Sequence, residues 1–502
     1  DGDGDGDGDG YGDGDGDGDG DGGGDGDGDG GGDGDGDGDG DGDGDGDGDG
    51  DGDGESSGTS GSSGSEMACD ANDGQPDPEN CVEVPDLFCV AGSCADCRSA
   101  AADASCALLS ADTGACRDDG RCVQCTTEND DACQGQTPIC DGGDNSCRGC
   151  VDHDECTAAC DLATGECMPD DKIWYVEQMD SGCHDSTATG DAADPFCGIG
   201  FAISRIEDDS KGTIIIVDDG DGWEDDLQID GKRTVAILAE KRATFSAATE
   251  EAPAILVEDG ATLYLVNAKV RHMASGDDGD PDDEMAIQCR YAAMWLDDVR
   301  VQDTEGLGVS SEECNVTIEN SRVQECEGGG VRFDGGELSM YNTLISENGD
   351  NSINVSTPAI YLNDMEHVEI VYCTVADNEA HDDHEGAVSL DCGPRENRGE
   401  IRNSIFVADD GDSLDSEACP NDALEFGFNA VDDDAFDDAP NKGVGDYDPE
   451  MFTGNFQLDT NKDDYKQLED IAHWAHGDPE KDINGTARPQ DQAGYPGIDE
   501  PA

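Results

Sequence analysis

The stretches LYLVNAKV (263–270), MWLDDVRV (294–301), VTIENSRV (316–323) and LSMYNTLI (338–345) decide the fold of this chain, because they follow one eight-residue pattern. Apolar residues stand at its first, third and eighth positions, and Asn or Asp stands at the fifth. Two looser copies follow at residues 368–375 and 399–406. Apolar side chains at every second position predict a short strand with one buried face.

The spacing of these copies indicates how the strands stack. Their fifth positions, residues 267, 298, 320, 342, 372 and 403, are separated by 31, 22, 22, 30 and 31 residues. A strand that recurs every 22 residues without a helix in between is typical of one rung of a parallel β-helix. A β-sandwich would instead place a hairpin turn about every 8 to 12 residues. We therefore expect an all-β solenoid over residues 171–502, with an amide ladder along its axis formed by Asn267, Asp298, Asn320, Asn342 and Asn403.

Cysteines mark a separate region. Sixteen of the 24 lie between Cys69 and Cys167, among Asp, Gly, Ala, Ser and Thr residues that cannot bury a core. Three CxxC motifs permit a zinc interpretation, but a zinc ribbon needs two such motifs for each metal. We expect instead disulfide-linked repeats over residues 67–170, formed in an oxidising compartment. The expected units are residues 89–106, 116–133 and 140–156, followed by the pair Cys160 and Cys167.

The amino-terminal segment is of low complexity. Its first 54 residues are 24 Asp, 29 Gly and one Tyr, which predicts an extended, disordered spacer over residues 1–66. An EF-hand interpretation does not fit, because the twelfth loop position, normally a bidentate Glu, is always Gly here. The chain begins with Asp1 rather than Met, so we expect a processed or truncated product, and the loss of an export signal would fit the cysteines.

The overall charge restricts the partners. The chain has 125 acidic and 25 basic residues and a formal net charge of -100, which excludes nucleic acid as a partner. No run of about 18 apolar residues suited to a transmembrane helix occurs.

Segments at both ends of the expected solenoid resemble a known family. Ile173–Val176 (IWYV), Asp194–Phe196 (DPF) and Gly212–Val217 (GTIIIV) resemble the first turns of pectate-lyase-like, right-handed parallel β-helix proteins. Residues 482–489 (DINGTARP) and 497–500 (GIDE) resemble the carboxy-terminal signature of bacterial surface β-helix proteins. The resemblance implies a right-handed solenoid in a monomeric bacterial protein that is secreted or displayed on the outer cell surface, with a lipid anchor as one option.

A basic stripe is expected along the rungs. Lys269, Arg300 and Arg322 each lie two residues after an Asn-like position and alternate with inward Val side chains, so they should face solvent. Together with Arg332 they are candidates for binding an acidic sugar. Salt bridges to the surrounding carboxylates are the alternative interpretation.

Two insertions between rungs contain candidate metal ligands. Residues 275–284 offer the hard oxygen ligands that suit Ca²⁺, and residues 377–385 add histidines that suit a borderline metal. The alternative is a solvated loop, which the acidic composition also predicts. Ca²⁺ is the one cofactor that the sequence suggests. The candidate ligands are Asp277, Asp278, Asp280, Asp282, Asp283, Glu284, His381, Asp383 and His384.

Cysteines within the solenoid suggest local disulfides. We expect the pairs Cys183–Cys197, Cys289–Cys314 and Cys392–Cys419, each worth about 3 kcal/mol on loop-closure grounds. Cys326 and Cys373 lie two rungs apart and form a less suitable pair.

Motifs of an enzyme are absent from the sequence. Lyases of the fold that the chain resembles hold Ca²⁺ on Asp ligands and use an Arg base, whereas hydrolases use close carboxylates. The adjacent Asp297 and Asp298 come nearest to such a site, but Asp298 occupies the ladder position. We therefore expect an exported cell-surface protein that binds carbohydrate or another surface polymer. A lyase or hydrolase acting on uronate polysaccharide is the alternative.

Overall fold

In the computed structural model, the chain divides into two units, residues 1–65 and 66–502, and every described residue belongs to the second. The described residues are 75–76, 88–90, 93–98, 103–109, 113–178, 183–218, 222–224, 226–249, 252–272, 285–349, 358–379, 388–391, 398–407, 414–415, 424–432, 441–443, 451–462, 464–490 and 492–501. No helix among them is long and apolar enough to cross a membrane.

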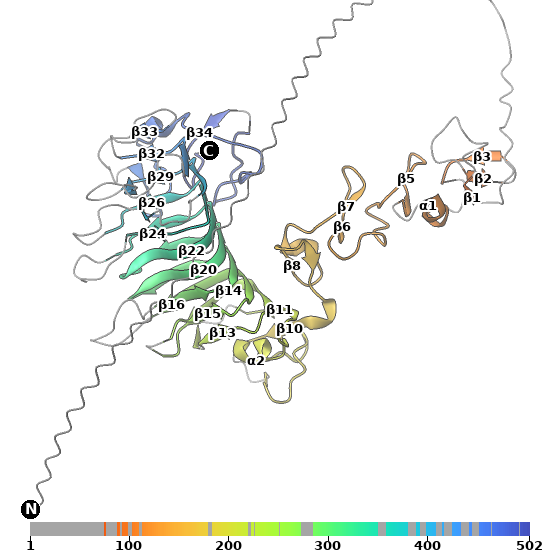
Figure 1. The fold of residues 1–502 in the computed structure, drawn as a ribbon, viewed down its shortest axis with the longest axis horizontal. Helices are drawn as coiled ribbons and strands as arrows, with labels where there is room; N and C mark the ends of the chain where they lie inside the picture. Colours follow the sequence, from red (N-terminus) through yellow and green to blue (C-terminus); the bar gives the residue numbers. More distant parts are fainter. Residues whose placement is uncertain are drawn as a thin grey trace, which may run out of the picture. The chain divides into compact units, whose positions relative to one another are not determined.

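Three stacks of parallel strands, which we call sheets A, B and C, form the expected all-β solenoid (Figure 1). The chain passes from sheet A to sheet B to sheet C in each rung, and β14, β16, β20 and β22 contribute to two sheets. Sheet A contains β10 (Ile173–Val176), β11 (Lys211–Ile216), the first parts of β14 (Thr234–Ser246) and β16 (Thr262–His272), β18 (Ala293–Asp297), the last parts of β20 (Leu307–Glu319) and β22 (Gly329–Tyr341), β25 (His367–Val371), β28 (Arg398–Arg402) and β31 (Leu424–Gly427).

Sheets B and C complete each rung. Sheet B contains β12 (Trp223–Glu224), the last parts of β14 and β16, β19 (Arg300–Thr304), β21 (Arg322–Gln324), β23 (Leu344–Ser346), β26 (Thr374–Ala376), β29 (Ile405–Phe406), β32 (Ala430–Val431) and β33 (Lys442–Gly443). Sheet C contains β13 (Leu227–Ile229), β15 (Ile255–Glu258), β17 (Ile287–Arg290), the first parts of β20 and β22, β24 (Ile360–Asn363), β27 (Val388–Asp391) and β30 (Leu414–Asp415).

Inward side chains at period two fill the solenoid. One column of register neighbours in sheet A is apolar and fully or almost fully buried: Leu263, Met294, Val316, Leu338 and Val368. Each such side chain contributes about 1.5 to 3 kcal/mol through burial. At the first turn, α2 (Ile199–Ile203) buries Ile199 and Ile203 against the core, and the disulfide Cys183–Cys197 closes the loop before it.

The Asn-like residues lie at the corner between sheets A and B. Asn267, Asp298, Asn320, Asn342, Tyr372 and Asn403 all have φ between 47° and 57°, a left-handed conformation that Asn and Asp tolerate better than most residues. Among the described residues of this column, a direct hydrogen bond between two amide side chains occurs once, from Asn342 Nδ2 to Asn320 Oδ1 at 3.2 Å. Asp298 instead forms an ion pair with Arg242. The recurrence of Asn therefore reflects backbone conformation more than a continuous ladder.

Buried hydrogen-bond ladders lie at other positions. One residue after the Asn-like column, Ser404 N donates to Asn429 Oδ1 at 3.0 Å, and Asn429 N donates to Asn441 Oδ1 at 3.2 Å. At the corner between sheets B and C, Asn348 Nδ2 donates to Asn378 Oδ1 at 2.9 Å. These side chains satisfy backbone groups that the turns leave unpaired.

The cysteine-rich region consists of small cross-linked units. Each described unit has four cysteines, paired first to third and second to fourth, and its third and fourth cysteines face each other across a hairpin. The hairpins are β4–β5 (Ala115–Cys116, Cys122–Val123), β6–β7 (Ile139–Asp141, Ser146–Arg148) and β8–β9 (Cys160–Asp161, Glu166–Cys167). The disulfides are Cys97–Cys116, Cys106–Cys122, Cys125–Cys140, Cys133–Cys147, Cys150–Cys160 and Cys156–Cys167.

This pairing confirms the expected disulfides but corrects the unit boundaries. Each CxxC motif joins the last cysteine of one unit to the first cysteine of the next, as at Cys122 and Cys125. The expected units, such as residues 116–133, therefore straddle two real ones. Before the first complete unit lie β1 (Gln75–Pro76), β2 (Phe88–Val90) and β3 (Ser93–Ala95), and within it lies α1 (Asp103–Leu109).

The third disulfide unit packs on the outer face of sheet A. The hydroxyl of Tyr264 donates to Asp161 Oδ1 at 2.6 Å and accepts from the N–H of Ala163 at 3.2 Å. Lys211 Nζ lies 2.6 Å from Asp161 Oδ2. Burial alone would raise the pKa of Asp161, but hydrogen bonds from Lys211 and Tyr264 hold it below its ordinary value. Apolar contacts surround this group: Ala158, Ala159 and Met168 pack with Ala236 and Tyr264.

The carboxy-terminal segment, residues 451–501, covers the far half of the solenoid. Phe452 and Leu458 pack on Leu344 and Ile405 of sheet B. Trp474 packs near Val371 and Tyr372 at the end of sheet A. The segment contains a short 3-10 helix, η5 (Asp464–Leu468), and the strand pair β34 (Ala472–His473) and β35 (Ala493–Gly494).

Candidate functional site

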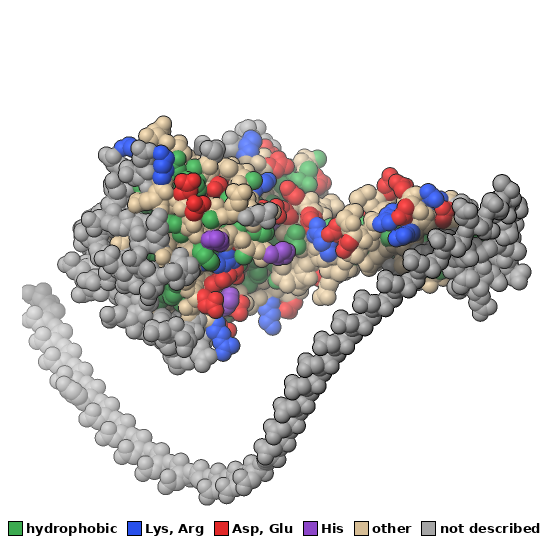
Figure 2. All heavy atoms as spheres, turned by 90° about the horizontal axis from the view of Figure 1, so that it is seen from above, with side chains coloured by type: hydrophobic (Ala, Val, Ile, Leu, Met, Phe, Trp, Pro, Cys, Tyr) green, Lys and Arg blue, Asp and Glu red, His purple; other side chains and the backbone are tan. Residues whose placement is uncertain are grey.

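Cations and carboxylates are paired over much of the described surface. On the face shown in Figure 2, basic side chains lie next to acidic ones in several places. Arg148 and Glu155, for example, approach to 2.5 Å, and Lys269 and Asp303 to 2.7 Å. Charged groups that lack such a partner therefore indicate where a ligand could bind.

A cleft of about 610 Å³ lies where sheet A meets the carboxy-terminal segment. Its floor is formed by Glu319, Asn320, Tyr341 and Asn342, at the ends of β20 and β22. Its wall is formed by seven residues of the carboxy-terminal segment: Gly477, Pro479, Glu480, Lys481, Asp482, Ile483 and Gly485.

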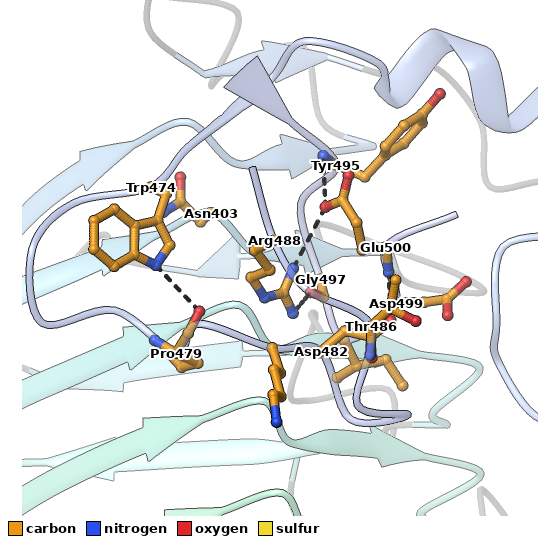
Figure 3. A network of polar contacts seen from close by, with 12 residues as sticks. Asn403, Trp474, Pro479, Asp482, Thr486, Arg488, Tyr495, Gly497, Asp499 and Glu500 are labelled. Atoms are coloured by element: carbon orange, nitrogen blue, oxygen red, sulfur yellow. Dashed lines mark hydrogen bonds and ion pairs between the residues drawn. The ribbon is translucent and has the colours of Figure 1, made fainter. Parts of the chain in front are cut away.

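A buried arginine holds this wall in place (Figure 3). Arg488 Nη2 donates to the carbonyl of Gly497 at 2.9 Å, as the figure shows, and to Asn342 Oδ1 at 2.8 Å. Its guanidinium lies 3.8 Å from the ring centre of Tyr372, and its side chain has no exposed surface. Glu500 Oε2 lies 3.8 Å from Arg488 Nη1. The segment that resembles a carboxy-terminal signature is thus fastened to the Asn-like corner of the solenoid.

Asp482 organises the turn that faces the cleft. Its Oδ1 accepts from the backbone N–H of Asn484 at 2.9 Å and of Thr486 at 2.7 Å. Its Oδ2 accepts from the N–H of Glu500 at 3.0 Å, which ties the two ends of the segment together (Figure 3). The carbonyl of Lys481, in the same turn, accepts from Asn342 Nδ2 at 2.8 Å.

Two carboxyl groups lie side by side at the cleft. Asp297 on β18 and Glu319 on β20 are register neighbours on the outer face of sheet A, and Tyr341 follows on β22. Neighbouring parallel strands lie about 4.8 Å apart. Burial raises the pKa of Glu319 to about 7, and the charges of Asp297 and Asp152 act in the same direction. Burial also raises the pKa of Asp297, against a 2.8 Å hydrogen bond from Asn320.

The pair has no cation partner among the described residues. The third carboxylate, Asp152, comes from the third disulfide unit, where its side chain caps η1 (His153–Glu155). In the wall, Glu480 and Asp482 outnumber the single cation Lys481, so acidic groups predominate in the cleft. An arrangement of carboxylates, amides and a phenol can accept and donate hydrogen bonds to a polyhydroxylated ligand.

The predicted basic residues fall on two different sheets. Lys269, Arg300 and Arg322 are register neighbours on the outer face of sheet B. Arg332 lies on sheet C between Ser310 and Tyr361, with its guanidinium 5.7 Å from the Tyr361 ring centre. Arg332 also lines a separate polar pocket of about 420 Å³ with Gln288, Glu312 and Asp334. The structure therefore does not bring the four residues together.

Several other predictions fall outside the described residues. These include every candidate metal ligand, Asp277, Asp278, Asp280, Asp282, Asp283, Glu284, His381, Asp383 and His384, and the cysteines Cys392 and Cys419. The structure joins Cys289 to Cys314 and leaves Cys326 and Cys373 as buried free thiols.

Sequence reasoning overlooked the pairing of Asp297 with Glu319. Both occupy the fourth position of the eight-residue pattern, directly before the Asn-like residue, and Tyr341 occupies it in the next copy. Aligning that outward position across copies would have shown the pair. No signal in the sequence placed the segment 477–485 over these residues.

The comparison with protein families agrees with the observed architecture. Residues 253–419 match the family model described as "Right handed beta helix region", and residues 15–173 match a family of unknown function (DUF8331). No curated protein matches the sequence. The crystal structure of pectate lyase Pel9A is 11% identical, with a TM-score of 0.32, covering 67% of this chain and 98% of the lyase. The complex of XylC with xylose is 9% identical, with a TM-score of 0.27, covering 65% of this chain and 98% of XylC. The match to the family model, together with the three parallel sheets, defines the solenoid as a right-handed β-helix.

Proposed function

We propose that this chain is an exported, glycan-binding β-helix protein and that the cleft on sheet A holds the glycan. The observation that carries the proposal is the cleft itself, where Glu319, Asn320 and Tyr341 present hydrogen-bonding groups next to a wall that Arg488 fastens to Asn342. A sugar ring offers many hydroxyl groups, so it needs acceptors and donors at close spacing. Carboxylates are the strongest acceptors among side chains.

The charge of the cleft favours neutral or amino sugars over uronates. A uronate carboxylate would meet Glu319, Glu480 and Asp482, against which the cleft lining sets one cation, Lys481. An ammonium group on an amino sugar would instead be attracted to these carboxylates. The cleft therefore does not support the uronate substrate that the sequence suggested as an alternative.

Hydrolysis is a second candidate function, and one observation favours it. With a pKa of about 7, Glu319 carries a proton in part at neutral pH, while Asp297 lies on the next strand. Glycoside hydrolases use two such carboxyl groups, one as an acid and the other as a base or nucleophile. In this role Glu319 would protonate the leaving oxygen.

Disulfides support the exported location. The units between Cys97 and Cys167 are cross-linked, and such density is typical of proteins made in an oxidising compartment. We propose that the acidic amino-terminal segment separates the folded unit from the surface to which the protein is attached.

A glycan array tests the proposal. Full-length protein is screened against neutral oligosaccharides, chitosan oligomers and oligogalacturonate, with released reducing ends measured in parallel. We expect binding to neutral or amino sugars that falls at least about tenfold in Glu319→Gln. Glu337→Gln, an exposed substitution on the same strand β22 that contributes Tyr341, is the matched control. Oligogalacturonate binding that is lost in Glu319→Gln, or equal binding of neutral and amino sugars by Glu319→Gln and Glu337→Gln, would refute the cleft as the proposed site. Release of reducing ends by wild type but not Glu319→Gln would establish hydrolysis.

A further inference from the structure

We propose that the outer face of sheet B contains a second, independent binding site, which takes a linear polysaccharide bearing carboxylate or sulfate groups. Its core is Arg300 and Arg322, flanked by Lys269, and we call these three residues the basic strip. The strip lies on a different sheet from the cleft and does not depend on the function proposed there.

Register aligns the strip. Lys269 on β16 pairs with Arg300 on β19, and Arg300 pairs with Arg322 on β21. The residue after each one, Val270, Val301 or Val323, is buried, so the basic side chains project outward. The three cations therefore recur about every 4.8 Å along the solenoid axis.

Amide donors run alongside the strip. Gln302 and Gln324 lie two residues after Arg300 and Arg322, on the same outer face. Gln324 Nε2 donates to Ser346 Oγ at 2.9 Å, which fixes its orientation on the sheet. A polymer lying across the rungs would meet guanidinium groups in one row and amides in the next.

Two of the three cations lack a carboxylate partner. Lys269 forms an ion pair with Asp303 at 2.7 Å. Arg300 has no ion pair within the described part of the chain, and the contact found there for Arg322 is a 3.5 Å approach to the carbonyl of Asn455. In a chain of 125 acidic and 25 basic residues, two adjacent arginines without carboxylates are unexpected.

Neighbouring cations act on both arginines of the strip. Burial lowers the pKa of Arg322, and the charges of Arg300 and Arg242 act in the same direction, while Asp298 opposes them. Arg300 is affected in the same way, by burial and then by Arg242. Arg242 forms an ion pair with Asp298. It therefore places a further positive charge near the strip but offers Arg300 and Arg322 no carboxylate partner.

The size of the strip is set by the carboxy-terminal segment. The next register neighbour after Arg322 is Leu344, which is buried in the apolar cluster with Phe452 and Phe456. The open face between Lys269 and Arg322 therefore spans about 10 Å. That length suits a short run of sugars carrying planar or tetrahedral anions, which guanidinium groups bind through paired N–H donors.

The net charge of -100 does not prevent such binding. At physiological ionic strength the Debye length is about 8 Å, so distant carboxylates are screened while groups in contact with the strip are not. Direct contacts to the arginines then determine the affinity.

Paired polymers test the inference. Binding of full-length protein at 0.15 M ionic strength is measured for polygalacturonate against its methyl ester, and for dextran sulfate against dextran. We expect binding to the charged member of at least one pair. We also expect Arg300→Gln with Arg322→Gln to weaken that binding about tenfold or more.

The control removes the same charge elsewhere. Lys232→Gln with Arg290→Gln changes two cations at the corner between sheets C and A, neither of which has an ion pair within the described part of the chain. This variant should bind as wild type does, and the Glu319→Gln variant should also be unaffected. Equal losses in both double variants would show that bulk charge alone acts. Equal binding to charged and neutral polymers, or full binding by Arg300→Gln with Arg322→Gln, would overturn the proposal.

Discussion

Asp297 and Glu319 are direct neighbours across the parallel strands β18 and β20, and both carboxyl groups have a pKa above the ordinary value. A carboxyl whose pKa is raised in the folded state binds its proton more tightly there than in the unfolded chain. Stability is therefore lost as pH rises from the ordinary Glu value toward about 7.

Glu319→Gln should abolish most of the loss of folding stability that wild type shows as pH rises. Glutamine keeps the shape but cannot ionise, so we expect the variant to match wild type near pH 4 and to exceed it at pH 8 by up to about 3 kcal/mol. Urea unfolding at both pH values measures the difference. Glu337→Gln, at an exposed position, should change stability little at either pH. An equal effect of the two substitutions would contradict the assignment.

Removing Arg488 should release the wall of the cleft. Arg488→Ala leaves Asn342 Oδ1 and the carbonyl of Gly497 without that donor and opens space beside Tyr372, so we expect a loss of about 3 kcal/mol. In the variant, backbone hydrogen exchange should become faster than in wild type for residues 471–501, while exchange in sheet A should change less. Arg290→Ala, an exposed substitution, serves as the comparison. Unchanged exchange in that segment would mean that Arg488 does not hold it.

The junction with the third disulfide unit can be tested with one hydroxyl group. Tyr264→Phe removes the donor to Asp161 and the acceptor for Ala163, which should cost about 1 to 2 kcal/mol because the Asp161 carboxylate is buried and the bond to Ala163 is partly buried. Tyr291→Phe removes an exposed hydroxyl that bonds Glu312 at 2.8 Å and should have little effect. Thermal unfolding and limited proteolysis near residue 170 give the readout. Equal effects would show that the junction adds no stability.

Peptide mapping without reductant should recover the first-to-third and second-to-fourth pairs. We expect Cys125 linked to Cys140, Cys133 linked to Cys147, and the same order in the two adjoining units. Cys326 and Cys373 should resist thiol reagents in the native protein, because burial raises the pKa of each to about 12. They should react after denaturation. A linkage within any CxxC motif, or bound zinc, would contradict this pairing.

Calcium binding remains a prediction for the insertion at residues 275–284. Thermal unfolding is compared in millimolar Ca²⁺ and in NaCl of equal ionic strength, for wild type and for Asp280→Asn with Asp282→Asn. A specific site should raise the Tm in Ca²⁺ beyond the effect of NaCl, since ligand binding adds RT ln(1 + [L]/Kd). The double variant should lose that excess. Equal shifts in the two salts would indicate screening alone.

The rungs were predictable because two local signals coincide in each copy. Apolar residues at period two define inward positions such as Leu263 and Met294, and the Asn-like residue marks a corner that requires positive φ. The role of that residue was harder to infer. Asn267 donates to the backbone carbonyl of Ala239 and Asp298 pairs with the side chain of Arg242, so both contacts depend on groups from another rung.

The site was less predictable because it combines distant segments. Asn342 meets Arg488 across 146 positions of sequence, and Tyr264 meets Asp161 across 103. Nothing in the local pattern of either partner specifies the other. The predicted boundaries of the disulfide units were wrong for a related reason. The two cysteines of a CxxC motif are close in sequence and suggest one unit, but they belong to two neighbouring units.

The closed pairing within each four-cysteine unit has an evolutionary consequence. The units begin at Cys97, Cys125 and Cys150, 28 and 25 residues apart, and none of their disulfides crosses into a neighbouring unit. Duplication or deletion of one whole unit would leave every remaining cysteine with its partner. The number of residues between the β-helix and the amino-terminal segment can therefore change by in-frame gain or loss of whole units, while oxidative folding of the other units proceeds unaltered.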